Sequence, residues 1–324
     1  MGTIPSNPHD AFFRHVLTRP AEAASELRAV LPKQVFALID WDSLQICKDS
    51  FVSPELRDRR SDVLLQARID RHDGYIHFHV EHQSSVDELM ALRMLEYTVN
   101  IWNHHLQTHP KAKRLPVVIP LVVYASRTRA RWDAQLDIAD LLDTGPTPEA
   151  LSDFLPHFRY QVDDLNSIDL PTLLRRPLAP MARTMFVLQK EAPGNTALDQ
   201  VLSLILTTLV AMFEGPHGTN DLNAVVTYIM KVAETPLTQI TPIIDKLGPE
   251  AQEAIVTTGD MLRAEGLAEG LAEGRAATLL DQLTIKFGDI SESVRRTVRE
   301  ATLQDLETWS RRIITADTLD AIFA

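Results

Sequence analysis

The stretch from Ser61 to Ser85 constrains the fold more than any other part of this chain, because it has the pattern of a single β-hairpin. Its second arm, Tyr75–Gln83, alternates strictly between apolar and polar side chains, which is typical of a half-buried strand. Its first arm, Asp62–Ile69, is extended and largely apolar in character. An Asp-Gly pair within Asp70–Gly74 is a strong short-range hairpin signal. We therefore predict two antiparallel strands joined by a short turn.

The register of this hairpin decides which polar side chains meet. If residues 72 and 73 form the tip, Asp62 lies opposite Gln83. Leu64 then lies opposite Glu81. Directly opposed residues share a face of the sheet, with Cβ atoms roughly 5 Å apart. The pattern predicts two carboxylates and an amide on one polar surface, and a slip of one residue would separate them.

The composition is that of an ordinary globular protein, because 45% of the 324 residues are hydrophobic and 23% are charged. The single cysteine, Cys47, excludes a disulfide framework, and no zinc-finger spacing of cysteine and histidine occurs. The first residues lack the basic and apolar regions of a signal peptide. The longest apolar stretch, Ala197–Phe213, is too short to span a bilayer. We expect a cytoplasmic protein without a membrane partner.

The net charge of −12 is unevenly distributed. Residues 1–135 hold 17 Lys/Arg and 16 Asp/Glu, whereas residues 136–324 hold 15 and 28. A generic nucleic-acid binder depends on neutralising phosphates and is usually basic. The overall charge therefore argues against a generic nucleic-acid binder, although the acidity belongs to the rear of the chain.

Four further segments give the order of elements in the front part. Asn7–Leu31 is predicted to be helical with an interruption at Pro20, and Leu44–Val52 is predicted to be a strand. After the hairpin, Asp87–Leu106 has strong helical periodicity. Leu115–Tyr124 is a nearly continuous apolar run, as in strands that are covered on both faces. The predicted order is helix, three strands, helix, strand.

The rear part is predicted to be entirely helical from about Ala130 onward, with a linker-like break near Gly215–Gly218. We expect domain boundaries that give a core at 1–130, a helical region at 131–258 and a tail at 259–324.

A repeat in the tail places three glycines at a period of four on one helix that ends at Gly288. The repeated glycines are Gly266, Gly270 and Gly274. Such a stripe indicates either close packing of helices, which would make the protein a homo-oligomer, or a flexible charged linker.

Five stretches together resemble a known bacterial family: HDAFFRHVL, RRSDVLL, HVEHQSSVDELMALRMLEY, LPVVIPLVVY and the tail AEGLAEGLAEGR with IKFG. They are similar to the recombination-promoting nuclease (Rpn) or "putative transposase" family within the PD-(D/E)xK nuclease superfamily. The resemblance spans nearly the full chain, and EHQSS with its following helix is the most specific stretch. It implies an α/β restriction-endonuclease-like core of order α-β-β-β-α-β, followed by an all-helical C-terminal region.

The resemblance also implies functional residues. Asp62 and Glu81 would bind a divalent metal, Gln83 occupies the position of the superfamily's lysine, and Asp10 on the first helix would assist. With the main-chain carbonyl near His82, the carboxylates supply hard oxygen ligands that suit Mg²⁺ or Mn²⁺. Gln83 cannot take a proton, so we expect it to orient the attacking water. The family thus implies a metal-dependent endonuclease that cuts DNA and promotes recombination.

One departure from the family pattern concerns the stretch after the last predicted strand. Ala125–Arg131 reads ASRTRAR where a glycine turn is usual.

Three alternative interpretations stay open. The polar residues of the hairpin could be its solvated face, in a weak or inactive nuclease fold that serves as a DNA-binding or assembly module. His77 and His79 could instead hold zinc together with Glu81. Three basic clusters could contact DNA phosphates or belong to ordinary solvated loops, namely Arg57–Arg60, Lys111–Arg114 and Arg127–Arg131.

Overall fold

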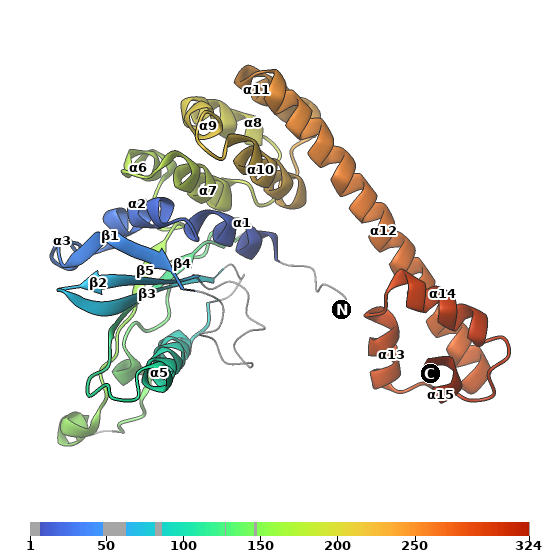
Figure 1. The fold of residues 1–324 in the computed structure, drawn as a ribbon, viewed down its shortest axis with the longest axis horizontal. Coiled ribbons are helices and arrows are strands. Elements are labelled where there is room, and N and C mark those ends of the chain that lie inside the picture. Colours follow the sequence, from blue (N-terminus) through green and yellow to red (C-terminus); the bar gives the residue numbers. More distant parts are fainter. Residues whose placement is uncertain (1–6, 48–62, 82–85, 127, 146–147, 324) are drawn as a thin grey trace. The chain divides into compact units, whose positions relative to one another are not determined.

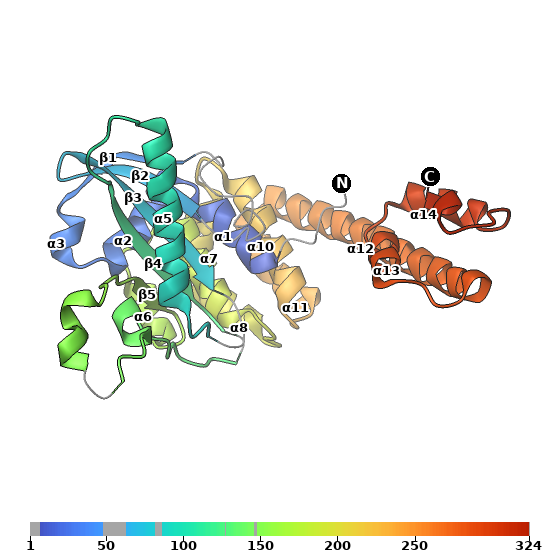
Figure 2. The ribbon, with the colours of Figure 1, turned by 90° about the horizontal axis from the view of Figure 1, so that it is seen from below.

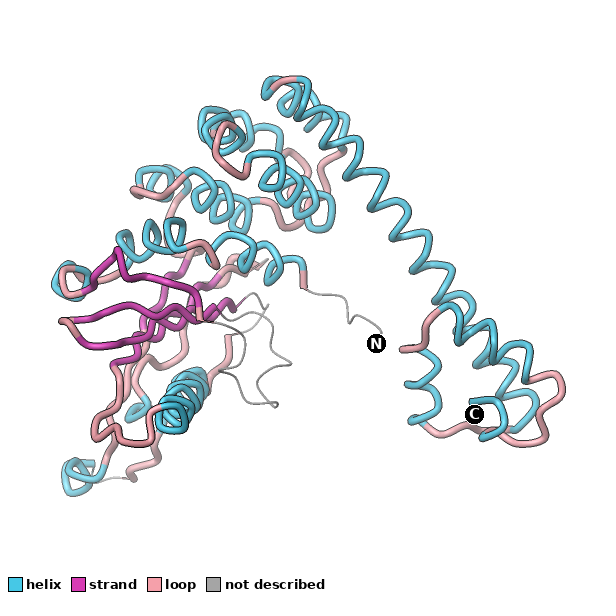
Figure 3. The backbone as a smooth tube through the Cα atoms, in the orientation of Figure 1, coloured by secondary structure: helices cyan, strands magenta, loops and turns pink. Residues whose placement is uncertain are grey.

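The computed structural model describes residues 7–47, 63–81, 86–126, 128–145 and 148–323. The chain forms two compact units, residues 6–255 and 256–324 (Figure 1). The larger unit is a mixed α/β structure built on a five-stranded sheet (Figure 3). Among the described helices, none combines the length and the apolar character needed to cross a membrane.

The sheet contains the strands in chain order, from β1 at one edge to β5 at the other. The first three strands pair antiparallel, whereas β3, β4 and β5 pair parallel. A helix, α5, connects β3 to β4, as a parallel pair requires. The bounds are β1 Ile39–Ile46, β2 Val63–Ile69, β3 His72–Glu81, α5 Met90–Thr108, β4 Val117–Tyr124 and β5 Gln161–Asp164.

The start of the chain forms two helices, α1 (Pro8–Leu17) and α2 (Pro20–Val30), as the interrupted pattern predicts. Each begins with a proline, whose fixed φ suits the first helical turn. The side chain of Asn7 caps α1 by accepting a hydrogen bond from the amide of His9 at 3.1 Å. A short helix, α3 (Lys33–Phe36), then leads into β1, which begins five residues before the predicted strand.

Helices cover both faces of the sheet, and β4 contacts a hydrophobic core on each side (Figures 1 and 2). Leu121 and Val123 belong to the core beneath α1, α2 and α7 (Pro180–Glu191). Val122, between them, belongs to the core beneath α5. All three are fully buried because alternate side chains of a strand point to opposite faces. The prediction of a strand covered on both faces is confirmed.

The turn of the β2–β3 hairpin differs from the predicted one. Asp70 and Arg71 form a two-residue turn with φ values of 47° and 66°, the positive values of a type I′ turn. Gly74 instead lies within β3, where a Cβ would come within 2.5 Å of the Ile69 side chain. The Asp-Gly pair therefore serves close packing rather than the turn.

The predicted register is consequently wrong by four residues. Leu64 pairs with His77 rather than with Glu81, and the last described pair is Val63 with Phe78. Four is an even number, so this correction does not conflict with the prediction that Asp62 and Glu81 share a face, which lies outside the described residues and side chains. In the observed register Leu64 does not lie opposite Glu81. The prediction that Asp62 lies opposite Gln83 therefore loses its basis.

The expectation that strands are absent after Ala130 is also wrong. β5 is a four-residue strand with the polar sequence QVDD, and it pairs with β4 from Leu121 to Tyr124. Its formation depends on this tertiary pairing, because the segment lacks the apolar pattern of an independent strand.

The remaining helices of the larger unit share the core of the sheet. The predicted break near Gly218 is a tight turn between α9 and α10, where a Cβ on Gly218 would come within 1.7 Å of the Phe213 carbonyl oxygen. The bounds are α6 Leu170–Arg175, α8 Leu198–Leu204, α9 Leu206–Phe213, α10 Gly218–Val232 and α11 Leu237–Ile244, with single 3-10 turns at Ile138–Leu141, Pro148–Phe154 and Asp245–Leu247.

The long helix α12 (Pro249–Phe287) begins in the larger unit and continues into the smaller one. It ends at Gly288, whose φ of 79° is the left-handed conformation expected of a helix stop. In the smaller unit, Ala276, Leu279 and Leu283 of α12 are buried against three following helices. These helices are α13 Glu292–Arg299, α14 Leu303–Arg312 and α15 Asp320–Phe323.

Candidate functional site

Several strand ends meet at one edge of the sheet. β3 ends at Glu81, which pairs with Tyr124, the last residue of β4. β5 also ends there, because Asp164 pairs with Tyr124 from the other side. β2 runs antiparallel to β3 and begins at this edge with Val63. Open α/β sheets bind ligands outside the carboxyl ends of their strands, so this edge is the candidate functional site.

The predicted metal ligands belong to this edge by their positions in the chain. Asp62 directly precedes Val63, and His82 and Gln83 directly follow Glu81. Asp62, His82 and Gln83 lie outside the described residues, and of Glu81, His77 and His79 only the backbone is described. The convergence of these side chains therefore stays a prediction.

Asp10, the predicted acid of the first helix, is described and lies in the first turn of α1. Ion pairs fix α1 and the following turn to α10. His15 Nε2 lies 2.9 Å from Asp221 Oδ1, and Arg19 Nη1 donates to Asp221 Oδ2 at 2.8 Å. Burial favours a raised pKa for Asp221, but the hydrogen bonds from His15 and Arg19 outweigh it and lower the pKa. The helix that carries Asp10 is thus held firmly against the helical layer.

The turn that follows β4 explains the missing glycine of the sequence. Arg129 has a φ of 57°, the left-handed conformation that a glycine would adopt freely. The Ser126 hydroxyl bonds to Thr128 Oγ1 at 2.8 Å and so closes the turn. The guanidinium of Arg129 forms an ion pair of 3.2 Å with Glu191. Of the predicted basic cluster at residues 127–131, Arg129 is therefore already paired with an acid.

A carboxylate that the sequence did not reveal organises the loops at this edge. Asp164 accepts hydrogen bonds from the amides of Trp132 at 3.0 Å and Asn166 at 2.9 Å, and also from the Ser167 hydroxyl. Lys190 Nζ donates to the Leu165 carbonyl at 2.8 Å. These bonds connect the segment after β4 to the end of β5. Asp164 is hence a structural residue of the edge and not a free metal ligand.

A buried charged cluster lies behind β5. Arg176 donates two hydrogen bonds, of 2.7 and 2.6 Å, to the buried carboxylate of Asp163. Glu26 of α2 is fully buried, with Oε1 3.7 Å from Arg176 Nη1, and neither carboxyl oxygen has a hydrogen-bond partner among the described residues. Burial, followed by the negative charge of Asp163, raises the pKa of Glu26 well above 4.5, while Arg176 opposes the rise. Burial in this cluster therefore favours the neutral form of the Glu26 carboxyl group.

The described residues contain no group of three or more histidine, cysteine, aspartate or glutamate side chains that could hold a metal ion. The predicted ligands stand outside that part of the chain or lack a described side chain. What the structure provides is the frame that would hold them, namely the paired ends of β3 and β4 and, three residues before the end of β3, the described start of β2.

Comparison with known proteins identifies the family of this α/β chain. Residues 7–218 match the family described as "Putative transposase, YhgA-like". The chain therefore belongs to this family, which was also the family that its motifs indicated. No solved structure matches it.

Two similar relatives are named as nucleases. The chain is 39% identical over 128 residues to recombination-promoting nuclease RpnD of Escherichia coli O157:H7, which is 39% of this chain and 49% of that protein. It is 38% identical over 119 residues to recombination-promoting nuclease RpnA of Escherichia coli K12, which is 37% of this chain and 40% of that protein. The matched segments thus span about half or less of these relatives.

A third relative aligns over much more of the chain. The inactive recombination-promoting nuclease-like protein RpnE of Escherichia coli K12 is 28% identical over 264 residues, which cover 81% of this chain and 83% of that protein. The family thus includes members named as nucleases and members named as inactive.

Proposed function

We propose that this protein is a divalent-metal-dependent DNA endonuclease with a PD-(D/E)xK core, which hydrolyses phosphodiester bonds and promotes recombination. The observation that carries this proposal is the shared edge at which β2 begins and β3 and β4 end. Asp62 directly precedes β2 in the sequence, and Glu81 is the last residue of β3. The names of RpnD and RpnA supply the reaction class.

The donor set fits a hard cation. Asp62, Glu81 and the main-chain carbonyl of His82 are all oxygen donors, which Mg²⁺ and Mn²⁺ prefer. When bound, the ion would supply Lewis acidity at the scissile phosphate. Gln83 donates and accepts hydrogen bonds but takes no proton, so its role is to orient the attacking water. Asp10, in the first turn of α1, would assist as a further acid.

Plasmid cleavage tests this proposal. Purified protein should nick plasmid DNA with Mg²⁺ or Mn²⁺ and should be inactive with EDTA. Asp62→Ala protein serves as the control for a contaminating nuclease. Equal nicking by the wild type and the Asp62→Ala variant would contradict the proposal.

A second candidate function is supported by the relative RpnE, whose name calls it inactive and which aligns with 81% of this chain. In this case the protein is a nuclease-like DNA-binding or assembly module without cleavage. The absence of a lysine at position 83 agrees with this alternative. Binding of a DNA duplex by a protein that cleaves under none of the metal conditions would favour it.

The partner of the smaller unit is proposed to be a second copy of the chain, because α12 has a second apolar face. Val256, Leu267, Leu271 and Ile285 are 62%, 76%, 47% and 85% exposed, respectively. At 3.6 residues per turn they fall within about 60° of one another around the helix. This face lies opposite the one that buries Leu279 and Leu283. No atom comes within 4 Å of a Cβ placed on Gly266, Gly270 or Gly274, so no other part of the described chain occupies the glycine stripe.

An antiparallel pairing of two α12 helices makes the exposed face self-complementary. If the two-fold axis passes between Gly270 and Leu271, Gly270 of each copy faces Leu271 of the other copy. Leu267 then faces Gly274, so that both leucines meet glycines that leave room for them. Val256 faces Ile285 at the two ends of the contact. Two of the three glycines, Gly270 and Gly274, which each cost a solvated helix about 1 kcal/mol, are accounted for by such a contact.

The charges along this face also suit a second copy. In the same pairing, Arg263 lies within one helical turn of Asp281 of the opposite helix. The pairing also brings Asp260 opposite Asp281, and Arg263 pairs with Asp260 at 3.0 Å within its own helix. One arginine of each helix therefore accompanies the two acids that the contact brings together.

A further inference from the structure

The β2–β3 turn carries an arginine where its backbone favours glycine. Arg71 has a φ of 66° and Asp70 a φ of 47°, and the usual sequences of such turns end in glycine. Arginine is energetically unfavourable at this position, because its Cβ is crowded in the left-handed conformation. Residues held in unfavourable backbone conformations are often retained for function.

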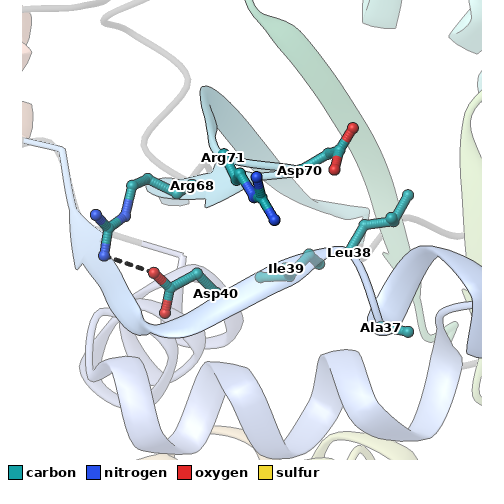
Figure 4. A pocket seen from close by; sticks show the side chains of 7 residues that line it. All are labelled: Ala37, Leu38, Ile39, Asp40, Arg68, Asp70 and Arg71. Atoms are coloured by element: carbon teal, nitrogen blue, oxygen red, sulfur yellow. Dashed lines mark hydrogen bonds and ion pairs between the residues drawn. The ribbon is translucent and has the colours of Figure 1, made fainter.

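The side chain of Arg71 is exposed, and the described residues include no partner for it. It lines an open pocket of about 390 Å³ together with Arg68, two acids, Asp40 and Asp70, and residues 37–39, which follow α3. Figure 4 shows the Arg71 guanidinium and the Asp70 carboxylate pointing in different directions from the turn. Arg68 donates one hydrogen bond of 2.6 Å to Asp40, which leaves most of its five donors available.

Other cations lie at the same end of the sheet. Gly74 pairs with Val117, so the segment that precedes β4 reaches the end of the sheet that carries the turn. Lys111, Lys113 and Arg114 of that segment are exposed. The end of the sheet remote from Glu81 is therefore rich in solvated cations, although the whole chain is acidic.

We propose that the Arg71 turn, with Arg68, is a second phosphate-binding site that contacts the DNA backbone away from the cleaved bond. This inference rests on the proposed nuclease function. Guanidinium groups bind phosphate oxygens through paired N–H donors and carry no sequence preference in doing so. β3 runs from His72, next to the turn, to Glu81 at the candidate site. At about 3.3 Å per residue the two sites are roughly 30 Å apart, or about nine base pairs of duplex DNA.

Two glycine variants of the turn form a matched pair. Arg71→Gly and Asp70→Gly both relieve a left-handed backbone conformation, but they remove opposite charges. Binding of fluorescein-labelled duplexes to the full chain is measured by anisotropy in EDTA, which prevents cleavage. Hairpin-closed duplexes of about 6 base pairs and linear duplexes of about 24 base pairs are used, because only the longer one spans both sites.

On the longer duplex, Arg71→Gly should bind about tenfold more weakly at roughly 0.1 M salt, and the salt slope should fall by about one. On the shorter duplex its affinity should equal that of the wild type. Asp70→Gly should bind both duplexes at least as tightly as the wild type. The melting temperature should fall in neither variant, so weaker binding cannot be attributed to unfolding.

Unchanged affinity and salt slope of Arg71→Gly on the longer duplex would overturn the second site while leaving the nuclease proposal intact. Equal weakening by Asp70→Gly would also overturn it, because the effect would then follow the backbone rather than the charge. A wild type that binds neither duplex would overturn the second site, and the plasmid assay then decides the nuclease function separately.

Discussion

Glu81 and Tyr124 are paired across the parallel strands β3 and β4 at the point where both strands end. Val63, the first described residue of β2, pairs with Phe78 and so lies three residues from Glu81 along the ladder. β3 therefore extends past the described start of β2 and is supported there by β4. The backbone of Glu81 therefore has a fixed position at this edge, which favours a well-positioned site there.

Replacing Asp62 by alanine should abolish cleavage without unfolding the protein. Loss of an outer-shell partner of a metal already costs about 10–100-fold, so loss of a direct ligand should cost at least about 100-fold. Removing one of two neighbouring carboxylates relieves repulsion and should leave the melting temperature unchanged or higher. Plasmid nicking and thermal melting measure both effects. Wild-type nicking by the folded variant would contradict the assignment of Asp62.

Replacing Gln83 by lysine should preserve or raise the cleavage rate. A lysine restores the side chain usual in the superfamily and adds positive charge near the phosphate. Gln83→Met, which keeps the approximate size but has no amide, should lose activity. A folded lysine variant without activity would show that the amide itself is required.

His77→Ala and His79→Ala should each reduce cleavage by less than about tenfold, because we assign both histidines to the flank of the site. Loss of a residue that contacts a metal ligand would cost more, about 10–100-fold. Elemental analysis of the native protein and of both variants provides an independent test. Stoichiometric zinc that disappears with either histidine would instead support a zinc site built from His77, His79 and Glu81.

Gly270→Leu should break the proposed contact between two α12 helices, whereas Gly270→Ala should be mild. A leucine at 270 would meet Leu271 of the partner copy. Light scattering should give twice the chain mass of 36.3 kDa for the wild type and the single mass for the leucine variant. Gly266→Leu, on the flank of the same helix, is the matched control and should remain dimeric. A leucine variant with the native mass would refute the contact.

Glu26→Gln should change how stability depends on pH. Because the folded-state pKa of Glu26 is raised above 4.5, its favourable contribution is complete below about pH 4.5. It is lost as the pH rises through the folded-state pKa. The wild type should therefore lose stability relative to Glu26→Gln as the pH rises above about 4.5, and the difference in Tm should grow with pH. The exposed Glu253→Gln is the control, and parallel Tm curves for wild type and Glu26→Gln would exclude a titrating Glu26.

Much of the sheet could be predicted from local patterns. β4 is a continuous apolar run because both of its faces are buried, and its alternation between two cores follows from strand geometry alone. The hairpin was also predictable, but its turn was not. The Asp-Gly pair at 73–74 is the stronger local signal, and only the contact of Gly74 with Ile69 shows that the glycine has another role.

The rest depends on contacts between distant residues. β5 has no apolar pattern and exists because β4 pairs with it. Glu26, Asp163 and Arg176 form one buried cluster although more than a hundred positions separate the first from the others. Residues so far apart in the sequence show no spacing pattern from which their contact could be predicted. The same holds for Asp164, whose hydrogen bonds to the loop after β4 become visible only in three dimensions.

The contact between Ile69 and Gly74 has a consequence for the history of this family. A Cβ at position 74 would lie 2.5 Å from the Ile69 Cδ1 atom, so a larger residue at 74 requires the side chain at 69 to move or to become shorter. Substitutions at these two positions should therefore be correlated among relatives, with small residues at 74 accompanying branched residues at 69. The order of such changes along a lineage also matters. A larger residue at 74 beside an unchanged residue at 69 would have overlapping atoms, whereas a shorter residue at 69 beside glycine would leave only a small cavity.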